Sequence, residues 1–224
     1  MSSKRFSYEY PHPAVTTDIV VFTIRDEQLK LLLIKRKLVP FKGQWALPGG
    51  FVTLNEDIEQ CAKRELVEET GVKNVYLEQL RTYGDPQRDP RERVITIAYF
   101  ALIASEKIRI QADTDAAAVN WFDTGDLPKL AFDHATIVND ALQRLQKKLD
   151  YSAIAFQFLS EEFTLSELQK IYEIIRGGEI DKRNFRKWAL SLEDIEETGE
   201  MNNAGAHRPA KLYRLRSHKR VVDL

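Results

Sequence analysis

The chain has 224 residues, of which 43% are hydrophobic and 30% charged, and its formal net charge is −1. These proportions are ordinary for a globular protein with its own apolar core, and the single cysteine, Cys61, excludes an intramolecular disulfide and favours a reducing compartment. The polar first residues and the lack of a membrane-length apolar run lead us to expect a cytoplasmic protein without a secretory signal or membrane partner.

Strands dominate the first 130 residues. Runs of β-branched and aliphatic residues predict strands over Thr17–Ile24 and Leu29–Lys35, and the polar link Asp26-Glu27 predicts that the two form a hairpin. Further strands are predicted over residues 75–83, 94–103 and 119–122. The first part of the chain is therefore expected to contain a β-sheet.

One strong helix interrupts these strands. It is predicted over residues 55–70, with Asn55 as its N-cap and Gly71 as its C-cap. Acidic residues in its first turn favour the positive end of the helix dipole. The apolar stripe that should face the body of the domain consists of Ile58, Ala62 and Leu66.

Three carboxylates on this helix share one side. Glu65, Glu68 and Glu69 stand at i, i+3 and i+4, so they fall within an arc of about 100° that overlaps the apolar stripe. Partly buried acids at this spacing repel one another, and hard oxygen ligands select Mg²⁺ or Mn²⁺. We predict a metal site at these three residues, with the backbone of Gly50 close by. The alternative is an acidic face that is merely solvated.

The surrounding segment carries a longer pattern. Residues 50–72 read GFVTLNEDIEQCAKRELVEETGV and resemble the Nudix box at every defining position. The resemblance implies hydrolysis of a nucleoside diphosphate linked to another group, in which metal ions neutralise the pyrophosphate and activate a water. It implies catalytic roles for Glu68, Glu69 and Arg64, and we expect Arg64 to orient a carboxylate and to be held by Glu56.

A charged loop, DPQRDPRER, covers residues 85–93. The resemblance places the general base outside the box, and the candidates in this loop are Asp85, Asp89 and Glu92. The same loop could instead bind ligand through its cations, which are Arg88, Arg91 and Arg93. A third alternative is an exposed charged turn between two strands.

The character of the sequence changes after Asp150. A second helix is predicted over Phe132–Leu149, and a domain boundary is expected between residues 150 and 162. We therefore expect a first domain over residues 1–150 and a second over residues 151–224.

The second domain has the element order of a winged helix-turn-helix. A capping box at Thr164–Glu167 opens one helix and Gly177 closes it, and Asp181 is the predicted N-cap of a second helix, Lys182–Leu192. Residues 194–198 and 211–216 are predicted to pair as a hairpin. A helix, a glycine-containing turn, a basic helix and a hairpin are typical of this motif.

Positive charge gathers at this end of the chain. Residues 180–224 hold ten Lys or Arg against seven Asp or Glu, whereas the preceding residues are net acidic. A basic end on an acidic body predicts a polyanionic partner, and the alternative is a small packing domain with a solvated basic face. The basic helix should bury Phe185, Trp188, Ala189 and Leu192. The predicted DNA-binding residues are Lys182, Arg183, Arg186, Lys187, Arg208, Lys211, Arg214 and Arg216.

Several separated segments, in order from about residue 15 to 216, carry a second resemblance. They read GQWALPGGF, LAFDHATIV, FTLSELQKIYEIIRG, DKRNFRKWAL and RPAKLYRL, and they resemble the Nudix-related transcriptional regulators of the NrtR type. The resemblance implies an α+β fold, in which a Nudix α/β/α-sandwich domain is followed by a small winged helix-turn-helix domain.

The resemblance also implies a function. Such a bacterial regulator would bind double-stranded operator DNA as a homodimer and sense ADP-ribose or a related NAD or sugar metabolite in its Nudix domain. Many regulators of this type have a decayed box, whereas this one is intact, so a Mg²⁺-dependent (or Mn²⁺-dependent) pyrophosphatase activity stays open. The alternative function is an ADP-ribose or nucleotide-sugar pyrophosphatase whose C-terminal domain serves dimerisation.

Overall fold

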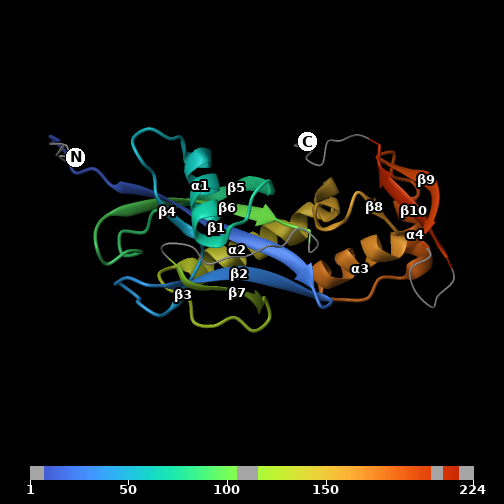
Figure 1. The fold of residues 1–224 in the computed structure, drawn as a ribbon, viewed down its shortest axis with the longest axis horizontal. Coiled ribbons are helices and arrows are strands. Elements are labelled where there is room, and N and C mark those ends of the chain that lie inside the picture. Colours follow the sequence, from blue (N-terminus) through green and yellow to red (C-terminus); the bar gives the residue numbers. More distant parts are fainter. Residues whose placement is uncertain (1–7, 105–115, 203–208, 217–224) are drawn as a thin grey trace.

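The computed structural model describes residues 8–104, 116–202 and 209–216, so the predicted DNA contact Arg208 lies outside the described residues. Within them the chain forms a mixed seven-stranded sheet flanked by helices and a smaller three-stranded sheet with helices of its own. Figure 1 shows these two parts end to end along the long axis of the molecule.

The larger sheet has the strand order β3-β2-β1-β6-β5, with β4 paired to β1 and β7 paired to β2. The pair β1–β6 is parallel and the other pairs are antiparallel. All five predicted strands are present, while β3 and β4 are too short to give a periodic signal. The strands are β1 (Ala14–Arg25), β2 (Gln28–Arg36), β3 (Trp45–Ala46), β4 (Gly49–Phe51), β5 (Tyr76–Tyr83), β6 (Val94–Leu102) and β7 (Ala116–Asp123).

The predicted hairpin between β1 and β2 is confirmed. Arg25 pairs with Gln28, so Asp26 and Glu27 alone form the turn, and their φ angles are 51° and 56°. Two successive positive φ values identify a type I′ turn, whose twist matches that of the flanking strands. This tight turn brings the end of β1 to the boundary with the C-terminal part.

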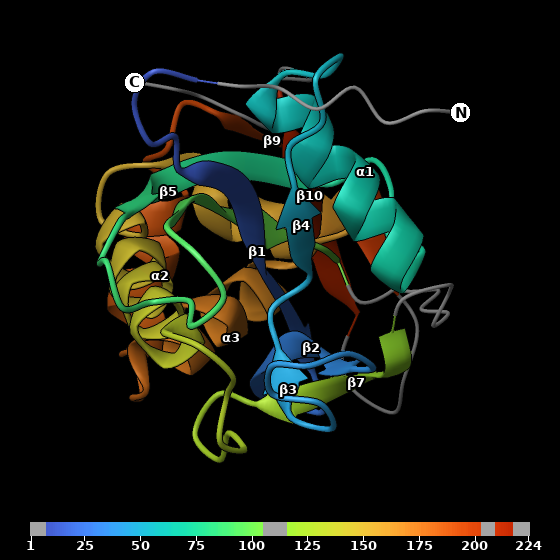
Figure 2. The ribbon, with the colours of Figure 1, turned by 90° about the vertical axis from the view of Figure 1, so that its left-hand side faces the viewer.

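The two faces of the sheet pack against different helices. On β1, Ile19 and Val21 pack with the helix α1 (Ile58–Thr70), whereas Val20 and Phe22 pack with the helix α2 (His134–Lys148). This alternation follows from the two-residue period of a strand. Figure 2 shows α1 and α2 on opposite sides of the sheet, which gives an α/β/α sandwich.

The helix α1 begins later in the chain than predicted. Asp57, not Asn55, is its N-cap: the Asp57 side chain accepts the Gln60 backbone N–H at 2.8 Å, and the Gln60 side chain accepts the Asp57 N–H at 3.0 Å. This reciprocal capping box satisfies two N–H groups that would otherwise lack partners. The predicted C-cap Gly71 is confirmed, with a left-handed φ of 73°.

The prediction that Ile58 faces the body of the domain was wrong. Its side chain is 38% exposed because the whole first turn of α1, residues 57–60, is exposed to solvent. Ala62 and Leu66 are buried as predicted, and the buried side of the helix continues through Glu69.

The helix α2 starts two residues after the predicted Phe132. Phe132 has a φ of 52°, which is incompatible with a helix, and Asp133 occupies the N-cap position. The C-terminal turn of α2 lies against the C-terminal part: Gln146 Nε2 donates to Ile175 O at 3.1 Å, and Arg176 donates to Asp150 at 2.6 Å.

The C-terminal part has the predicted winged order, and one further strand. Thr164 and Glu167 form the capping box, Gly177 ends the first helix in a left-handed conformation, and Asp181 caps the second. The added strand β8 pairs with β10 and completes a sheet of order β8-β10-β9. The elements are a 3₁₀ helix η2 (Ala153–Phe158), β8 (Glu162–Phe163), α3 (Leu165–Arg176), α4 (Lys182–Ala189), β9 (Ile195–Asn202) and β10 (Ala210–Leu215).

The helix α4 is shorter than predicted and buries a narrower stripe. It ends at Ala189 rather than at Leu192, because the Ser191 backbone N–H and hydroxyl both bond to the carbonyl of Trp188 in a closing turn. Phe185 and Ala189 are buried as predicted, but Trp188 is 39% exposed. Its ring lies at the edge of the core, 5.2 Å from that of Phe185.

One apolar cluster runs through both parts of the molecule. It starts at Val20 on β1 and continues through Leu145 on α2, Phe156 in η2 and Leu168 on α3 to Tyr213 on β10. The winged part is therefore packed against the sandwich. In the described ranges, no helix is long and apolar enough to cross a membrane.

Candidate functional site

The acidic face of α1 runs from the interior to the solvent. Glu69 is buried, and its Oε2 accepts the backbone N–H of Gly49 at 2.8 Å. The side chain of Glu65 is 13% exposed, and that of Glu68 is 52% exposed. Burial raises the pKa of the Glu65 carboxyl, although a hydrogen bond from Arg64 opposes this. The three predicted ligands thus have different environments within one turn.

Arg64 is the centre of this acidic face. Its Nε and Nη2 donate to both oxygens of Glu56 at 2.9 and 2.8 Å, and its Nη1 donates to Glu65 at 2.7 Å and to Glu68 at 3.0 Å. The hydrogen bonds from Arg64 and from the Thr53 backbone lower the pKa of Glu56 to about 2. Glu56 holds Arg64 through the fork geometry that guanidinium and carboxylate share, as predicted.

The two glycines before this helix permit two close approaches. A Cβ atom on Gly49, whose φ is 154°, would lie 2.0 Å from the backbone oxygen of Thr17 on β1. A Cβ atom on Gly50 would lie 2.3 Å from Oε1 of Glu65. Gly49 therefore lets β4 pair with β1, and Gly50 leaves room for a carboxylate of the acidic face.

The donor atoms of this face suit a hard divalent cation, but Arg64 now sets their spacing. Carboxylate oxygens of Glu65 and Glu68 meet at one guanidinium nitrogen, and such oxygens are the ligands that Mg²⁺ and Mn²⁺ prefer. In the part of the chain that the structure describes, no three His, Cys, Asp or Glu side chains are already arranged around a common metal position. The chemistry of the residues fits a cation, and binding one requires the carboxylates to turn towards it.

A pocket opens beside the acidic face. Of the residues predicted for metal or ligand, Gly50, Glu69, Arg88 and Arg91 line it. Arg36 on β2 lines it too, which the sequence patterns did not indicate. The pocket thus joins one end of the predicted metal site to the charged loop.

An ionic network lies beside this pocket and lines it through Asp18, Arg88 and His134. The Arg88 side chain is 4% exposed and donates to Asp18 at 3.2 Å and to Asp133 at 2.7 Å. His134 Nδ1 accepts the backbone N–H of Leu47 at 2.9 Å, and its Nε2 lies 3.4 Å from Asp18. The histidine is therefore neutral with its proton on Nε2, and burial lowers its pKa.

The sequence did not predict this network. It changes the role expected of Arg88, which was predicted to bind ligand. The only sequence signal was Asp18, the one charged residue in the predicted strand Thr17–Ile24. Arg88 is shared between Asp18 and Asp133, so it offers no surplus positive charge to a ligand. Its contacts join β1 to the start of α2.

The three candidate bases lie in different places. Asp89 is buried and lines the pocket, whereas Asp85 and Glu92 are exposed on the loop. Burial alone would raise the pKa of the Asp89 carboxyl, but hydrogen bonds from Arg91 outweigh it and hold that pKa below its usual range. A carboxylate with a lowered pKa accepts protons weakly, because a general base works best with a pKa near the working pH.

The cations of the loop are also held by neighbours. Arg91 Nη2 donates to Asp89 at 2.7 Å, and its guanidinium lies 5.3 Å from the ring centroid of Phe51. Arg93 Nη1 donates to the Gly84 carbonyl at 2.6 Å, which closes the loop. Arg36 lies 4.7 Å from the ring of Phe132 and also lines the pocket. Arg36 and Arg91 are thus the cations that combine a pocket position with an aromatic neighbour.

The predicted cations of α4 lie on its exposed side. Lys182, Arg183, Arg186 and Lys187 are exposed, and none forms an ion pair with another described residue. Phe185 and Ala189 fix the opposite side in the core. Among the described residues, this face therefore presents four positive charges without an ion-pair partner.

The predicted cations of the hairpin are less free. Lys211 pairs with Glu197 at 2.7 Å, and Arg214 pairs with Glu196 at 2.7 Å across the strands β9 and β10. Arg216 Nε donates to the Ile195 carbonyl at 3.2 Å. In the hairpin, acidic side chains thus lie beside the basic ones, in contrast to α4.

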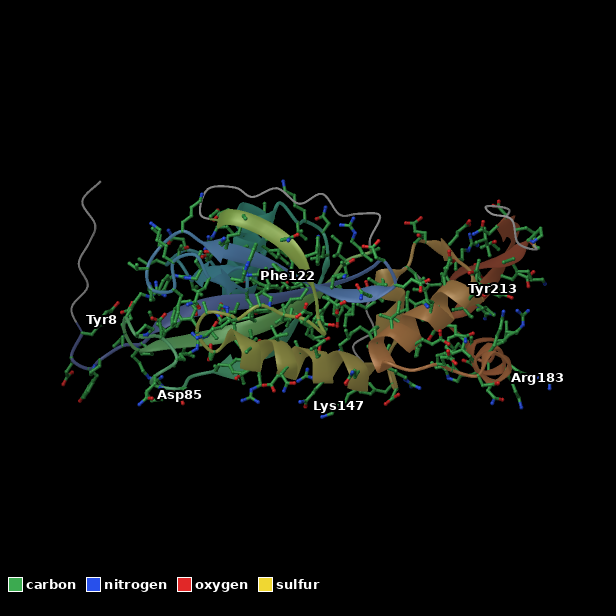
Figure 3. The ribbon with its side chains drawn as sticks, turned by 90° about the horizontal axis from the view of Figure 1, so that it is seen from below. Tyr8, Asp85, Phe122, Lys147, Arg183 and Tyr213 are labelled. Carbon is green, nitrogen blue, oxygen red and sulfur yellow. The ribbon has the colours of Figure 1, made fainter. Side chains whose placement is uncertain are left out.

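The pocket with its charged loop and the positive face of α4 lie at opposite ends of the molecule. Figure 3 places Asp85, on the charged loop, near one end and Arg183, on α4, at the other. The helix α2 lies between them, with His134 in the wall of the pocket and Gln146 against α3.

Comparison with known families matches both parts. Residues 15–141 match the NUDIX domain, and residues 155–215 match the NrtR DNA-binding winged helix domain.

One curated relative matches nearly the whole chain, and another matches part of it. The chain is 41% identical over 210 residues to the ADPR responsive transcriptional repressor NtrR of Acinetobacter baylyi, covering 92% of this chain and 83% of the relative. It is 42% identical over 134 residues to an ADP-ribose pyrophosphatase of Methanocaldococcus jannaschii, covering 60% of this chain and 76% of that protein.

Solved structures agree with this comparison. Shewanella oneidensis NrtR complexed with a 27mer DNA superposes with a TM-score of 0.80 at 39% identity, over 90% of this chain and 93% of that one. The NUDIX domain of the same protein complexed with ADP ribose gives a TM-score of 0.57 at 39% identity, over 61% of this chain and 90% of that one.

Proposed function

The chain belongs to the NrtR-type, Nudix-related transcriptional regulators, and from this premise we propose that it binds operator DNA through α4 and β9–β10 and senses ADP-ribose in the pocket beside α1. It acts in the cytoplasm as a homodimer, with residues 1–150 as the sensing domain and residues 151–224 as the DNA-binding domain. The observation that carries the proposal is the separation of two charged surfaces, a cation-containing pocket at one end and the exposed cations of α4 at the other.

The pocket suits a diphosphate with flat groups attached. Arg36 and Arg91 supply positive charge beside aromatic rings, and the Gly49-Gly50 backbone supplies a surface without side chains. The relatives that respond to ADPR or are complexed with ADP ribose support this choice of ligand. Arg88 supports the pocket from below through its buried ion pairs.

The acidic face would hold Mg²⁺ or Mn²⁺ through Glu65, Glu68 and Glu69, with the Gly50 backbone beside them. When bound, the cation would neutralise the pyrophosphate of the ligand. Arg64 holds two of these carboxylates in place, and Glu56 holds Arg64.

A DNA-binding assay with and without ADP-ribose tests the function. We expect specific binding to duplexes from upstream of the genes that neighbour its own, and a change in affinity of at least fivefold when ADP-ribose and Mg²⁺ are added, since typical coupling energies are about 1–3 kcal/mol. Binding that is blind to sequence and disappears as salt rises would contradict operator recognition, because phosphate contacts alone depend steeply on salt.

The second candidate function is hydrolysis of ADP-ribose, favoured by the intact acidic face and by the similarity to an ADP-ribose pyrophosphatase. If the chain cleaves ADP-ribose, Glu68→Gln should abolish Mg²⁺-dependent release of AMP. The matched control is Glu59→Gln on the same helix, where the exposed acid pairs only with Lys63 among the described residues. Equal turnover in both variants would show that the activity does not come from this face.

A further inference from the structure

The first turn of α4 differs from those of α1 and α3. In the latter two the third residue is Gln60 or Glu167, and its side chain accepts the N–H of the N-cap residue at 3.0 or 2.6 Å. In α4 the third residue is Asn184. Its backbone N–H bonds to Asp181 Oδ1 at 2.8 Å, but its side-chain amide makes no hydrogen bond to the residues that the structure describes.

Asn184 is exposed, and the core fixes its direction. Because Phe185 and Ala189 are buried, Asn184 lies roughly 120° around the helix from the centre of the buried side, next to Lys187 one turn later. The other exposed first-turn residues, Lys182 and Arg183, are cations. The Asn184 amide therefore lies at the edge of the positive face of α4, between Lys187 and Trp188.

Amide and ammonium groups contact different parts of DNA. Cations such as Lys187 hold phosphates, which position a protein but carry no sequence information. An asparagine amide offers a donor and an acceptor side by side, and these match N7 and the N6 amino group of adenine in the major groove. The first turn of a recognition helix is the part that contacts base edges.

We propose that Asn184 reads an adenine in the major groove, so that the operator contains an A·T pair that this residue selects. The proposal rests on the proposed binding of DNA through α4. The lack of a capping-box bond from Asn184 is consistent with this role, because an amide bonded to its own helix could not reach a base.

In vitro selection from a pool of random duplexes tests the proposal, because the selection itself identifies the preferred sequence. The full chain and its Asn184→Ala variant are both selected at the same salt. We expect the wild-type motif to contain an invariant A·T pair that becomes degenerate in the variant motif, while the other positions stay the same. Replacing that pair by G·C should weaken wild-type binding about 5- to 150-fold, the equivalent of about 1–3 kcal/mol, and leave the variant within about twofold.

Lys187→Ala is the matched control on the same face. It should keep the wild-type motif, weaken binding to all sequences alike and lower the slope of affinity against salt by about one. Identical motifs for wild type and Asn184→Ala, with unchanged thermal midpoints, would overturn the role of Asn184. A wild-type chain that enriches no motif would instead overturn the DNA-binding function on which it rests.

Discussion

Gly49 and Gly50 are neighbours in the chain, yet each leaves room for a different partner. The space beside Gly49 is filled by backbone of β1, which is held by the sheet and cannot move aside. The space beside Gly50 is filled by the end of the Glu65 side chain, which can rotate. The same substitution should therefore affect stability at one position and chemistry at the other.

We expect Gly49→Ala to lower the free energy of unfolding by about 1–3 kcal/mol or more, from backbone strain and the contact with Thr17. Gly50→Ala should cost less stability but weaken binding of Mg²⁺, because the Glu65 carboxylate must move. Urea denaturation and metal titration of both variants measure these effects. A Gly50→Ala protein with wild-type metal affinity would show that the position of Glu65 is irrelevant to the ion.

Burial of a neutral histidine makes stability depend on pH. The folded-state pKa of His134 is lowered by burial, although Asp18 and Asp133 oppose this, so the unfolded chain binds a proton more readily. The stabilising contribution is present above the unfolded pKa of about 6.5 and is lost as the pH falls through the folded value.

The thermal midpoint should therefore fall between pH 7 and pH 5. In His134→Asn this decrease should be shallower, from a lower midpoint at pH 7, because the substitution removes the titrating group together with its hydrogen bond from Leu47 and its contact with Asp18. A variant with the same slope as wild type would assign the pH dependence to other groups. Midpoints measured by calorimetry at half-unit steps decide this.

Among the elements, α4 and the hairpin β9–β10 both carry Lys and Arg side chains, but these differ in whether a carboxylate pairs with them. The cations of α4 are unpaired among the described residues, whereas Lys211 and Arg214 already have carboxylate partners. Binding DNA through the hairpin must therefore break or share ion pairs, and nearby Glu196 and Glu197 repel phosphate. The helix should supply more of the binding energy than the hairpin.

We accordingly expect Arg183→Ala or Arg186→Ala to weaken operator binding about tenfold and to leave ADP-ribose binding unchanged, since α4 and the pocket lie at opposite ends of the molecule (Figure 3). Arg214→Ala should have a smaller effect, because it also leaves Glu196 unpaired. Mobility shifts at several salt concentrations, with parallel calorimetric titration of ADP-ribose, provide the comparison. A larger loss of operator affinity for Arg214→Ala would show that the hairpin, not α4, supplies more of the binding energy.

At the scale of the whole molecule, the shared core joins the sandwich to the winged part. The cluster that contains Leu145 and Leu168 is continuous, and polar contacts of Gln146 and Asp150 with α3 accompany it. Domains that share a core of this kind are expected to unfold together rather than in sequence.

We therefore expect one cooperative unfolding transition. We also expect ADP-ribose to protect the backbone amides of α3 and α4 against hydrogen exchange, although the proposed ligand pocket lies at the other end of the molecule. A ligand that binds only the folded state raises the stability of every region that unfolds in the same transition. Two separate transitions, or protection confined to the sandwich, would mean that the two parts unfold independently.

Local patterns in the sequence predicted most of the longer helices and strands and suggested a metal site on the acidic helix. The period of the apolar residues, the capping boxes and the glycines act locally, so the hairpin β1–β2, the helix with Glu65, Glu68 and Glu69, and the basic face of α4 could all be read from residues a few positions apart. The N-cap of α1 was misplaced because Asn55 and Asp57 are both suitable cap residues, and the bond from Gln60 that selects Asp57 is visible only in the structure.

The role of each charged residue became visible only in the folded chain. Asp18, Arg88 and the adjacent pair Asp133-His134 come from three distant parts of the chain, and their network exists because β1, the charged loop and the start of α2 meet at one point. The same is true of Arg36 in the pocket and of the hairpin cations that cross-strand acids neutralise. The sequence shows whether a side chain is acidic or basic but not which residues surround it. Those surrounding residues determine whether the side chain binds a ligand or supports the fold.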